Sequence, residues 1–327
     1  MGRSTRPADR PATRRRTHMR IAVIGAGGIG GYFGGRLAVA GHEVALVARG
    51  EHLAALRRDG LTVDSPKGDF TLAPAGFTAT GDTGEVGPVD VVLLCVKTWQ
   101  LDEAVKALPP LMGPGTAVIT LQNGVEAPVE VAEAVGRDAV WPGTARIIAL
   151  LAGLGHVRHV GGAGLLTFGE WDGRRSARVE RFAEALNGAG VSVELPADPW
   201  VALWAKLLFV ATAGGLCATV EAPFGVIREQ AGTRAMVAAA MTEVAAVAAA
   251  EGVELPADIV DESMAFLDRQ PAEGTPSLHR DILEGKRSEL EAWTGSVVRL
   301  GKRTGTPTPV CAFVYTILSA REASRRG

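Results

Sequence analysis

The chain has 327 residues, of which 47% are apolar and 21% charged, and its formal net charge is −2. This length suits about two domains of an ordinary globular protein. The small net charge gives no reason to expect nucleic acid or an anionic membrane as a partner. The three cysteines lie far apart, so we expect free thiols and a reducing, cytoplasmic environment rather than disulfides or a metal centre.

Residues 1–18 differ from the rest of the chain. They hold six arginines, one acidic residue and two prolines, with no aliphatic run. Such a segment cannot bury a core, and it lacks the apolar stretch of a secretory signal. We therefore expect a disordered basic extension, followed by a first domain at residues 19–196.

Short apolar runs alternate with helical stretches from Arg20 to about Leu195. This alternation predicts βαβ units and an α/β domain with a doubly wound parallel sheet of the Rossmann type. The expected strands are Ile21–Ile24, Val44–Ala48, Val89–Val96, Ala117–Leu121, Gly164–Phe168 and Val191–Leu195. The expected helices are Ile29–Ala40, Asp102–Leu108 and Arg178–Leu186.

The first expected strand runs directly into a G-x-G-x-x-G pattern. Its glycines would allow a tight turn, close approach of a pyrophosphate and close helix–strand packing. The N-terminus of the following helix would present free N–H groups to the phosphates. We therefore predict a dinucleotide site rather than a plain glycine-rich turn, formed by Gly25, Ala26, Gly27, Gly28, Ile29 and Gly30.

The end of the second expected strand indicates which dinucleotide binds. NAD-binding domains usually carry an acidic residue there, which holds the ribose 2′-hydroxyl. This chain has Arg49 instead, and a guanidinium suits the 2′-phosphate of NADP. We predict NADPH/NADP+ as the cofactor; the alternative is an ordinary surface arginine, and the nearby Glu51 weakens the prediction.

The strand signal largely disappears after Pro196, which predicts an all-α domain at residues 197–327. The cleft between two domains is the usual place for a ligand. The run Ala235–Ala250 is shorter than the roughly twenty residues of a membrane span, so we interpret it as a core helix. The expected helices are Trp200–Val210, Val226–Glu229, Thr233–Glu251, Pro256–Leu267, Ser277–Arg303 and Pro309–Ala323.

Five segments, taken in order, resemble the ketopantoate reductase (2-dehydropantoate 2-reductase) family. The resemblance covers most of the chain after Met19 and is far more specific than the glycine pattern alone. The segments are Val96-Lys97-Thr98-Trp99-Gln100, Gln122-Asn123-Gly124, Leu203-Trp204-Ala205-Lys206-Leu207, Pro276-Ser277-Leu278-His279-Arg280-Asp281-Ile282 and Ser288-Glu289-Leu290-Glu291.

The resemblance implies NADPH-dependent reduction of a 2-oxo acid, in this family 2-dehydropantoate to pantoate in pantothenate biosynthesis. It also implies residue roles. These are Lys206 as proton donor, Glu289 ordering cofactor or substrate, Lys97, Asn123 and Ala149 beside the cofactor, and Ser277, with Asn123 and Lys206, against the substrate.

Elementary chemistry supports the role of Lys206. Hydride addition to a carbonyl carbon builds negative charge on the oxygen, which a positioned cation stabilises and protonates. A lysine in a desolvated cleft has its pKa lowered toward working pH, which makes it a better acid. Taken alone, these polar residues would be ordinary: solvated lysines, a turn asparagine, a solvated helix face at Glu289, and a helix first turn at Ser277 capped by Thr275.

The chain departs from the family at Val210, Gly214 and Phe224, where the family carries substrate-binding asparagines. Each hydrogen bond lost costs about 0.5–1.5 kcal/mol. The polar substrate should therefore bind weakly unless other side chains replace the amides, for which the candidates are Thr212, Thr219 and Glu221.

Two alternatives follow from these departures: a related reductase of a bulkier or less polar oxo substrate, or a non-catalytic NADP-sensing protein. The apolar helical domain also suits a homodimer. We predict no metal site, because the pair His156 and His159 has no third ligand nearby in the sequence.

Overall fold

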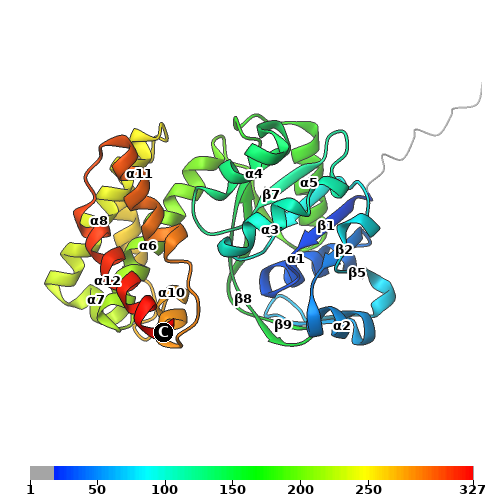
Figure 1. The fold of residues 1–327 in the computed structure, drawn as a ribbon, viewed down its shortest axis with the longest axis horizontal. Helices are drawn as coiled ribbons and strands as arrows, with labels where there is room; N and C mark the ends of the chain where they lie inside the picture. The colour runs from blue at the N-terminus through cyan, green and yellow to red at the C-terminus, as the bar shows by residue number, and fades with distance from the viewer. Residues whose placement is uncertain (1–17, 327) are drawn as a thin grey trace, which may run out of the picture.

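The computed structural model describes residues 18–326, so the expected disordered extension at 1–18 lies almost entirely outside the described residues. Two bodies lie side by side in Figure 1, a sheet with helices packed against it and a bundle made only of helices. Among residues 18–326, all strands belong to the first body, which ends at β10, and the bundle begins at α6.

In the described part of the chain, the sheet has ten strands. They are β1 (Arg20–Ile24), β2 (Glu43–Val47), β3 (Leu61–Asp64), β4 (Phe70–Leu72), β5 (Thr78–Thr80), β6 (Val91–Leu94), β7 (Ala117–Thr120), β8 (Val140–Gly153), β9 (His156–Phe168) and β10 (Ser192–Glu194). Their order is β4-β3-β9-β8-β7-β6-β1-β2-β5, with β10 paired to β9. Pairing is parallel from β8 to β5, while β8–β9 and β3–β4 are antiparallel.

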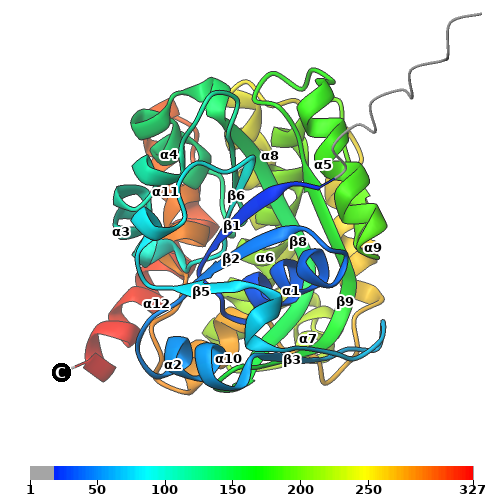
Figure 2. The ribbon, with the colours of Figure 1, turned by 90° about the vertical axis from the view of Figure 1, so that its right-hand side faces the viewer.

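Helices flank this sheet on both sides. They are α1 (Gly28–Val39), α2 (Gly50–Asp59), α3 (Leu101–Lys106), α4 (Ala127–Val135) and α5 (Ala177–Gly188). Short 3-10 turns are η1 (Pro74–Gly76), η2 (Thr83–Glu85), η3 (Thr98–Gln100), η4 (Pro109–Leu111) and η5 (Arg137–Ala139). Figure 2 shows β6, β1, β2 and β5 following one another across the sheet, with α3 and α4 on one flank and α5 on the other. The doubly wound α/β class is confirmed.

The central strands explain why this class was readable from the sequence. Every residue of β6 and β7 is buried, as is every residue of β1 after Arg20. Strands covered on both faces need continuous apolar runs, which is the signal that the sequence carries.

The prediction of Gly164–Phe168 as a lone strand was too short. The structure has a long antiparallel hairpin, β8 with β9, that turns through Gly155 in the left-handed region (φ +70°). Much of the hairpin's outer half is exposed, so its residues do not form the apolar run expected of a buried strand. The helices α2 and α4 and the strands β3, β4 and β5 were also missed.

Up to Arg326, the last residue that the structure describes, the bundle contains seven α-helices and one π-helical turn. They are α6 (Pro199–Val220), α7 (Phe224–Glu229), α8 (Ala231–Ala250), α9 (Ile259–Asp268), α10 (Ser277–Leu283), the π-helix η6 (Glu291–Gly295), α11 (Ser296–Thr304) and α12 (Pro309–Arg326). The α-helical class of this second part is confirmed.

The prediction of one helix over Ser277–Arg303 was wrong. The chain leaves α10 after Leu283, passes through Gly285 in the left-handed region (φ +67°), and resumes helical structure only at η6. The residue that caps α10 is Pro276, not Thr275. This interruption carries Glu289 out of a regular helix and toward the first domain.

Helices α6 and α8 are long and apolar enough to cross a membrane by length and composition alone. Such evidence is weak, because the core helix of a globular protein passes the same test. Two-thirds of the most apolar window of α6 is buried by the rest of the chain, against one-third for α8. The expectation that Ala235–Ala250 is a core helix therefore holds for only one face of α8.

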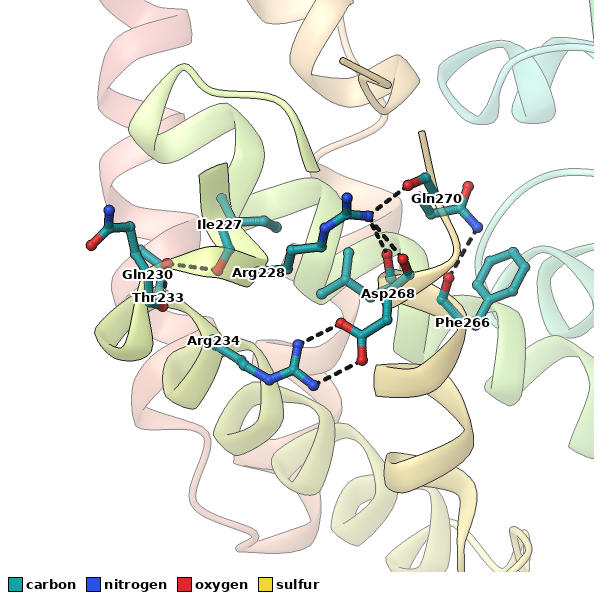
Figure 3. Close-up of polar contacts among 9 residues, drawn as sticks. Ile227, Arg228, Gln230, Thr233, Arg234, Phe266, Asp268 and Gln270 are labelled. Carbon is teal, nitrogen blue, oxygen red and sulfur yellow. Dashed lines mark hydrogen bonds and ion pairs between the residues drawn. The ribbon is translucent and has the colours of Figure 1, made fainter. Parts of the chain in front are cut away.

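A polar cluster fixes the part of the bundle that leads to α10 (Figure 3). The guanidinium of Arg228 on α7 donates to the backbone carbonyls of Asp268 (3.0 Å), the last residue of α9, and of Gln270 (2.6 Å), just beyond this helix. Arg234 on α8 forms a two-pronged ion pair with the Asp268 carboxylate, at 2.6 and 2.9 Å. These contacts anchor the loop that runs from Gln270 to Ser277.

Candidate active site

The glycine-rich loop has the geometry of a phosphate site. Gly25 adopts φ +96°, and the N–H groups of Gly25 and Ala26 donate to the Val47 carbonyl at 3.1 and 3.3 Å. A Cβ added at Gly30 would lie 2.2 Å from the Gly25 oxygen, so only glycine packs there. Gly27 caps α1 without a side-chain bond and faces open space, so free helix N–H groups can meet a pyrophosphate.

Strand β8 passes directly against this loop. A Cβ added at Gly28 would lie 2.2 Å from the carbonyl oxygen of Ala149. Ile29 follows in the first turn of α1, half-buried against the core. Ala149 is therefore brought beside the glycine loop, although 120 residues separate them in the chain.

His52 is a supporting residue that the sequence interpretation missed. Its Nδ1 accepts a hydrogen bond from the Gly155 N–H at 3.2 Å, so its Nε2 carries the proton and donates to the Ala26 carbonyl at 2.7 Å. One imidazole thereby joins the glycine loop to the tip of the β8–β9 hairpin.

Arg49 caps α2, two residues after the end of β2, and pairs with an acidic side chain from a distant part of the sequence. Its Nη1 pairs with Oε2 of Glu103 on α3 at 2.6 Å, and both side chains are about 60% exposed. Glu51, which seemed the nearby acid from sequence, has no ion pair with Arg49. The acid that pairs with Arg49 is thus Glu103, in the first turn of α3.

Three of the predicted residues meet across the boundary between the two bodies. Oε2 of Glu289 accepts from Lys97 Nζ at 3.0 Å and from Asn123 Nδ2 at 3.3 Å. Glu289 is 5% exposed, whereas Lys97 remains half-exposed. Lys97 and Asn123 lie beyond the ends of neighbouring strands β6 and β7, so the sheet itself sets their spacing.

Local packing explains why this contact forms. The Gln122 amide donates to the carbonyls of Leu94 and Val96, both at 3.0 Å, which fixes the end of β6. Gly124 has φ +117°, and a Cβ there would lie 2.8 Å from the Ala292 oxygen. The bundle can approach so closely only because the Asn-Gly dipeptide leaves this space open.

Lys206 sits in a desolvated position on α6. Its Nζ donates to the Ala145 carbonyl on β8 at 2.7 Å. Burial lowers the pKa of Lys206 to about 8; the carboxylate of Glu289 opposes this shift and Arg146 adds to it. A lysine with this pKa exchanges its proton near neutral pH, as a general acid requires.

Ser277 begins α10, which packs on α6. It is half-buried, and its hydroxyl has no hydrogen-bond partner within residues 18–326. A Cβ added at Gly214, two turns beyond Lys206, would contact Pro276 and Trp293 at 3.5 Å. The face of α6 that carries Lys206 therefore leads toward Ser277.

The three positions at which the resemblance predicts asparagines lie on or next to α6 and carry no polar side chain. Val210 and Gly214 follow Lys206 at four-residue spacing, so they share one face of α6. Phe224 is 7% exposed, and its ring centroid lies 6.1 Å from that of Phe209, which in turn packs on Phe266 at 4.8 Å.

The proposed replacements for the missing amides are engaged elsewhere. The hydroxyls of Thr212 and Thr219 donate to carbonyls of α6 itself, at 2.6 and 2.8 Å. Glu221, at the end of α6, accepts from Arg321 on α12. None of the three candidates therefore offers a free hydrogen-bond donor in place of the amides.

The histidine pair lies on β9. His156 Nε2 contacts Asp64 Oδ2 at 2.7 Å, and His159 Nδ1 contacts Ser65 Oγ at 2.9 Å. Within residues 18–326, no group of three or more His, Cys, Asp or Glu side chains is arranged to hold a metal ion.

Comparison with known proteins agrees with this geometry. Residues 21–173 match the family model described as ketopantoate reductase PanE/ApbA, and residues 200–322 match its C-terminal model. The 2-dehydropantoate 2-reductase of Halobacterium salinarum is 34% identical over 94% of this chain and 100% of its own length.

Solved structures give the same result. The ketopantoate reductase of Ralstonia eutropha JMP134 superposes with a TM-score of 0.86 at 32% identity, covering 94% of this chain and 100% of that one. A D-mandelate dehydrogenase bound to NADH and anilino(oxo)acetate superposes at 0.84 with 25% identity and the same coverage. The chain belongs to the ketopantoate reductase family of oxidoreductases.

Proposed function

We propose that this protein reduces a 2-oxo acid to a 2-hydroxy acid with NADPH, the first substrate to test being 2-dehydropantoate. The observation that carries the proposal is the partly buried Lys206 amine with a pKa lowered to about 8, held at Ala145 on β8. We assign residues 19–196 to cofactor binding and 197–327 to substrate binding.

The residues of the first domain suit a nicotinamide dinucleotide. The glycine loop would hold the pyrophosphate, Arg49 the 2′-phosphate, and Ala149, Lys97 and Asn123 the nicotinamide half. The cofactor supplies the hydride that adds to C2 of the substrate. The NADH complexes of D-mandelate dehydrogenases support a nicotinamide cofactor in this fold.

The chain's own residues would handle charge and protons. Lys206 Nζ would donate its proton to the substrate oxygen, where negative charge develops. Glu289 would hold Lys97 and Asn123 in place and keep Lys206 protonated, and Ser277 would bind the substrate from α10.

A second candidate substrate class is favoured by one observation. Val210 and Gly214 leave the face of α6 beyond Lys206 without a polar side chain, Phe224 is buried against Phe209, and Thr212 and Thr219 bond to their own helix. Such a face suits a bulkier or less polar oxo acid than 2-dehydropantoate.

A steady-state comparison separates these candidates. NADPH oxidation would be measured with 2-dehydropantoate, branched aliphatic 2-oxo acids and aryl 2-oxo acids. We expect kcat/KM for at least one 2-oxo acid in the range of typical enzymes, about 10⁴ M⁻¹s⁻¹ or more. Preference for 2-dehydropantoate at micromolar KM would eliminate the bulky class, and preference for aryl acids would eliminate pantoate formation. Tight NADPH binding without turnover of any oxo acid would favour an NADP-sensing role.

We also propose a homodimer formed through the bundle. Phe313 and Ile317 on α12 are 51% and 42% exposed, and α8 buries only a third of its apolar window. Light scattering of the parent protein should give the mass of two chains. The double variant Phe313→Glu, Ile317→Glu should give the mass of a single chain. A monomeric parent protein would contradict the proposal.

The net charge of −2 and the free cysteines suit a cytoplasmic enzyme without nucleic-acid or membrane partners.

A further inference from the structure

The ion pair between Arg49 and Glu103 lies at the predicted 2′-phosphate position. The Val47 carbonyl braces the glycine loop through Gly25 and Ala26, and Arg49 follows Val47 by two residues. Glu103 reaches the same place from the first turn of α3, with Oε2 at 2.6 Å from Arg49 Nη1.

The ion pair between Arg49 and Glu103 is weak enough for a competing anion to displace it. The two side chains are 60% and 61% exposed, and exposed ion pairs contribute little to stability because water and salt screen them. A phosphate dianion offers more charge and more acceptor oxygens than a carboxylate. A 2′-phosphate can therefore displace Glu103 from Arg49, but it must then lie close to a displaced carboxylate of like charge.

The Glu103 carboxylate would favour binding of NADH, which has a ribose 2′-hydroxyl in place of the 2′-phosphate. Nucleotide-binding domains that use NAD hold the ribose 2′-hydroxyl with an acidic side chain. Glu103 can accept that hydrogen bond while Arg49 remains neutralised beside it. The site thus contains an arginine for one cofactor and an acid for the other.

We propose that Glu103 sets the cofactor preference of this enzyme by competing with the 2′-phosphate for Arg49, which weakens NADPH binding and sustains NADH binding. This inference rests on the proposed function, because it places the adenosine ribose beside Arg49. Other acids do not compete: Asp102 pairs with Lys106 at 2.7 Å, and Glu51 makes no ion pair with Arg49.

The test measures cofactor dissociation constants without any oxo acid. Full-length protein and Glu103→Gln would be titrated with NADPH and with NADH by calorimetry or cofactor fluorescence. We expect Glu103→Gln to lower the Kd for NADPH about three- to tenfold, with an unchanged or raised Kd for NADH. Glu103→Lys should move the NADPH constant further in the same direction.

Two comparisons make the result specific. Asp102→Asn, the adjacent carboxylate on the same helix turn, should leave the NADPH/NADH ratio of Kd values unchanged. In an Arg49→Ala background, Glu103→Gln should lose most of its effect on NADPH, because the two side chains act on the same phosphate.

The failures are distinguishable. If Arg49→Ala weakens NADPH selectively while Glu103→Gln and Glu103→Lys leave the ratio unchanged, the inference about Glu103 is overturned and the cofactor assignment stands. If Arg49→Ala does not change the ratio either, the assignment of the 2′-phosphate to Arg49 fails and takes the inference with it.

Discussion

Lys206→Ala should lower kcat for oxo acid reduction about 10²-fold or more, with the Kd for NADPH changed less than about twofold. The amine is the partly buried cation that would meet charge developing on the substrate oxygen, and its pKa of about 8 lets it give up a proton. Lys206 contacts β8 at Ala145, not the glycine loop, so cofactor binding should survive.

Two variants make this expectation discriminating. Lys206→Arg keeps a positive charge but cannot release its proton near neutral pH, so it should remain strongly impaired. Lys302→Ala removes an exposed lysine of α11 and should behave as the parent protein. Unimpaired turnover by Lys206→Ala would refute its role as proton donor.

The parts of the fold that the sequence predicted are those with a strong local signal. β1, β6 and β7 are buried on both faces and therefore carry continuous apolar runs. The β8–β9 hairpin was truncated because its outer half is exposed, where burial no longer dictates residue type. The false helix over Ser277–Arg303 arose because helix-compatible residues flank Gly285 on both sides. The interrupted segment carries Glu289, whose contacts with Lys97 and Asn123 of the first domain leave no local pattern in the sequence.

The residues of the candidate site also differ in whether a local sequence pattern points to them. The glycine pattern and Arg49 were readable because strand ends and turns restrict residue choice locally. His52 and Glu103 were not, because their partners lie 26 and 54 positions away and no local pattern requires them. A histidine in the turn after Arg49 and an acid in the first turn of α3 were the only signals, and both are common on solvated helices.

The pH dependence of reduction should report Lys206 directly. Its protonated form is the acid, so kcat/KM for the oxo acid should be level below pH 8 and fall about tenfold per unit above it. Oxidation of the hydroxy acid needs the neutral amine, so its profile should instead rise toward the same pKa. Glu289 raises the pKa of Lys206, since a nearby carboxylate favours the protonated amine.

Glu289→Gln should therefore lower the pKa of Lys206. The falling limb of the reduction profile and the rising limb of the oxidation profile should both move to lower pH. Reduction at pH 7 should also slow about tenfold, because Lys97 and Asn123 lose the charged partner that orients them. Glu291→Gln is the matched control: this carboxylate lies two residues away, pairs with Arg299 and Tyr315, and does not act on Lys206. A slower Glu289→Gln enzyme with an unmoved profile would leave Glu289 a positioning role and exclude electrostatic control of the proton donor.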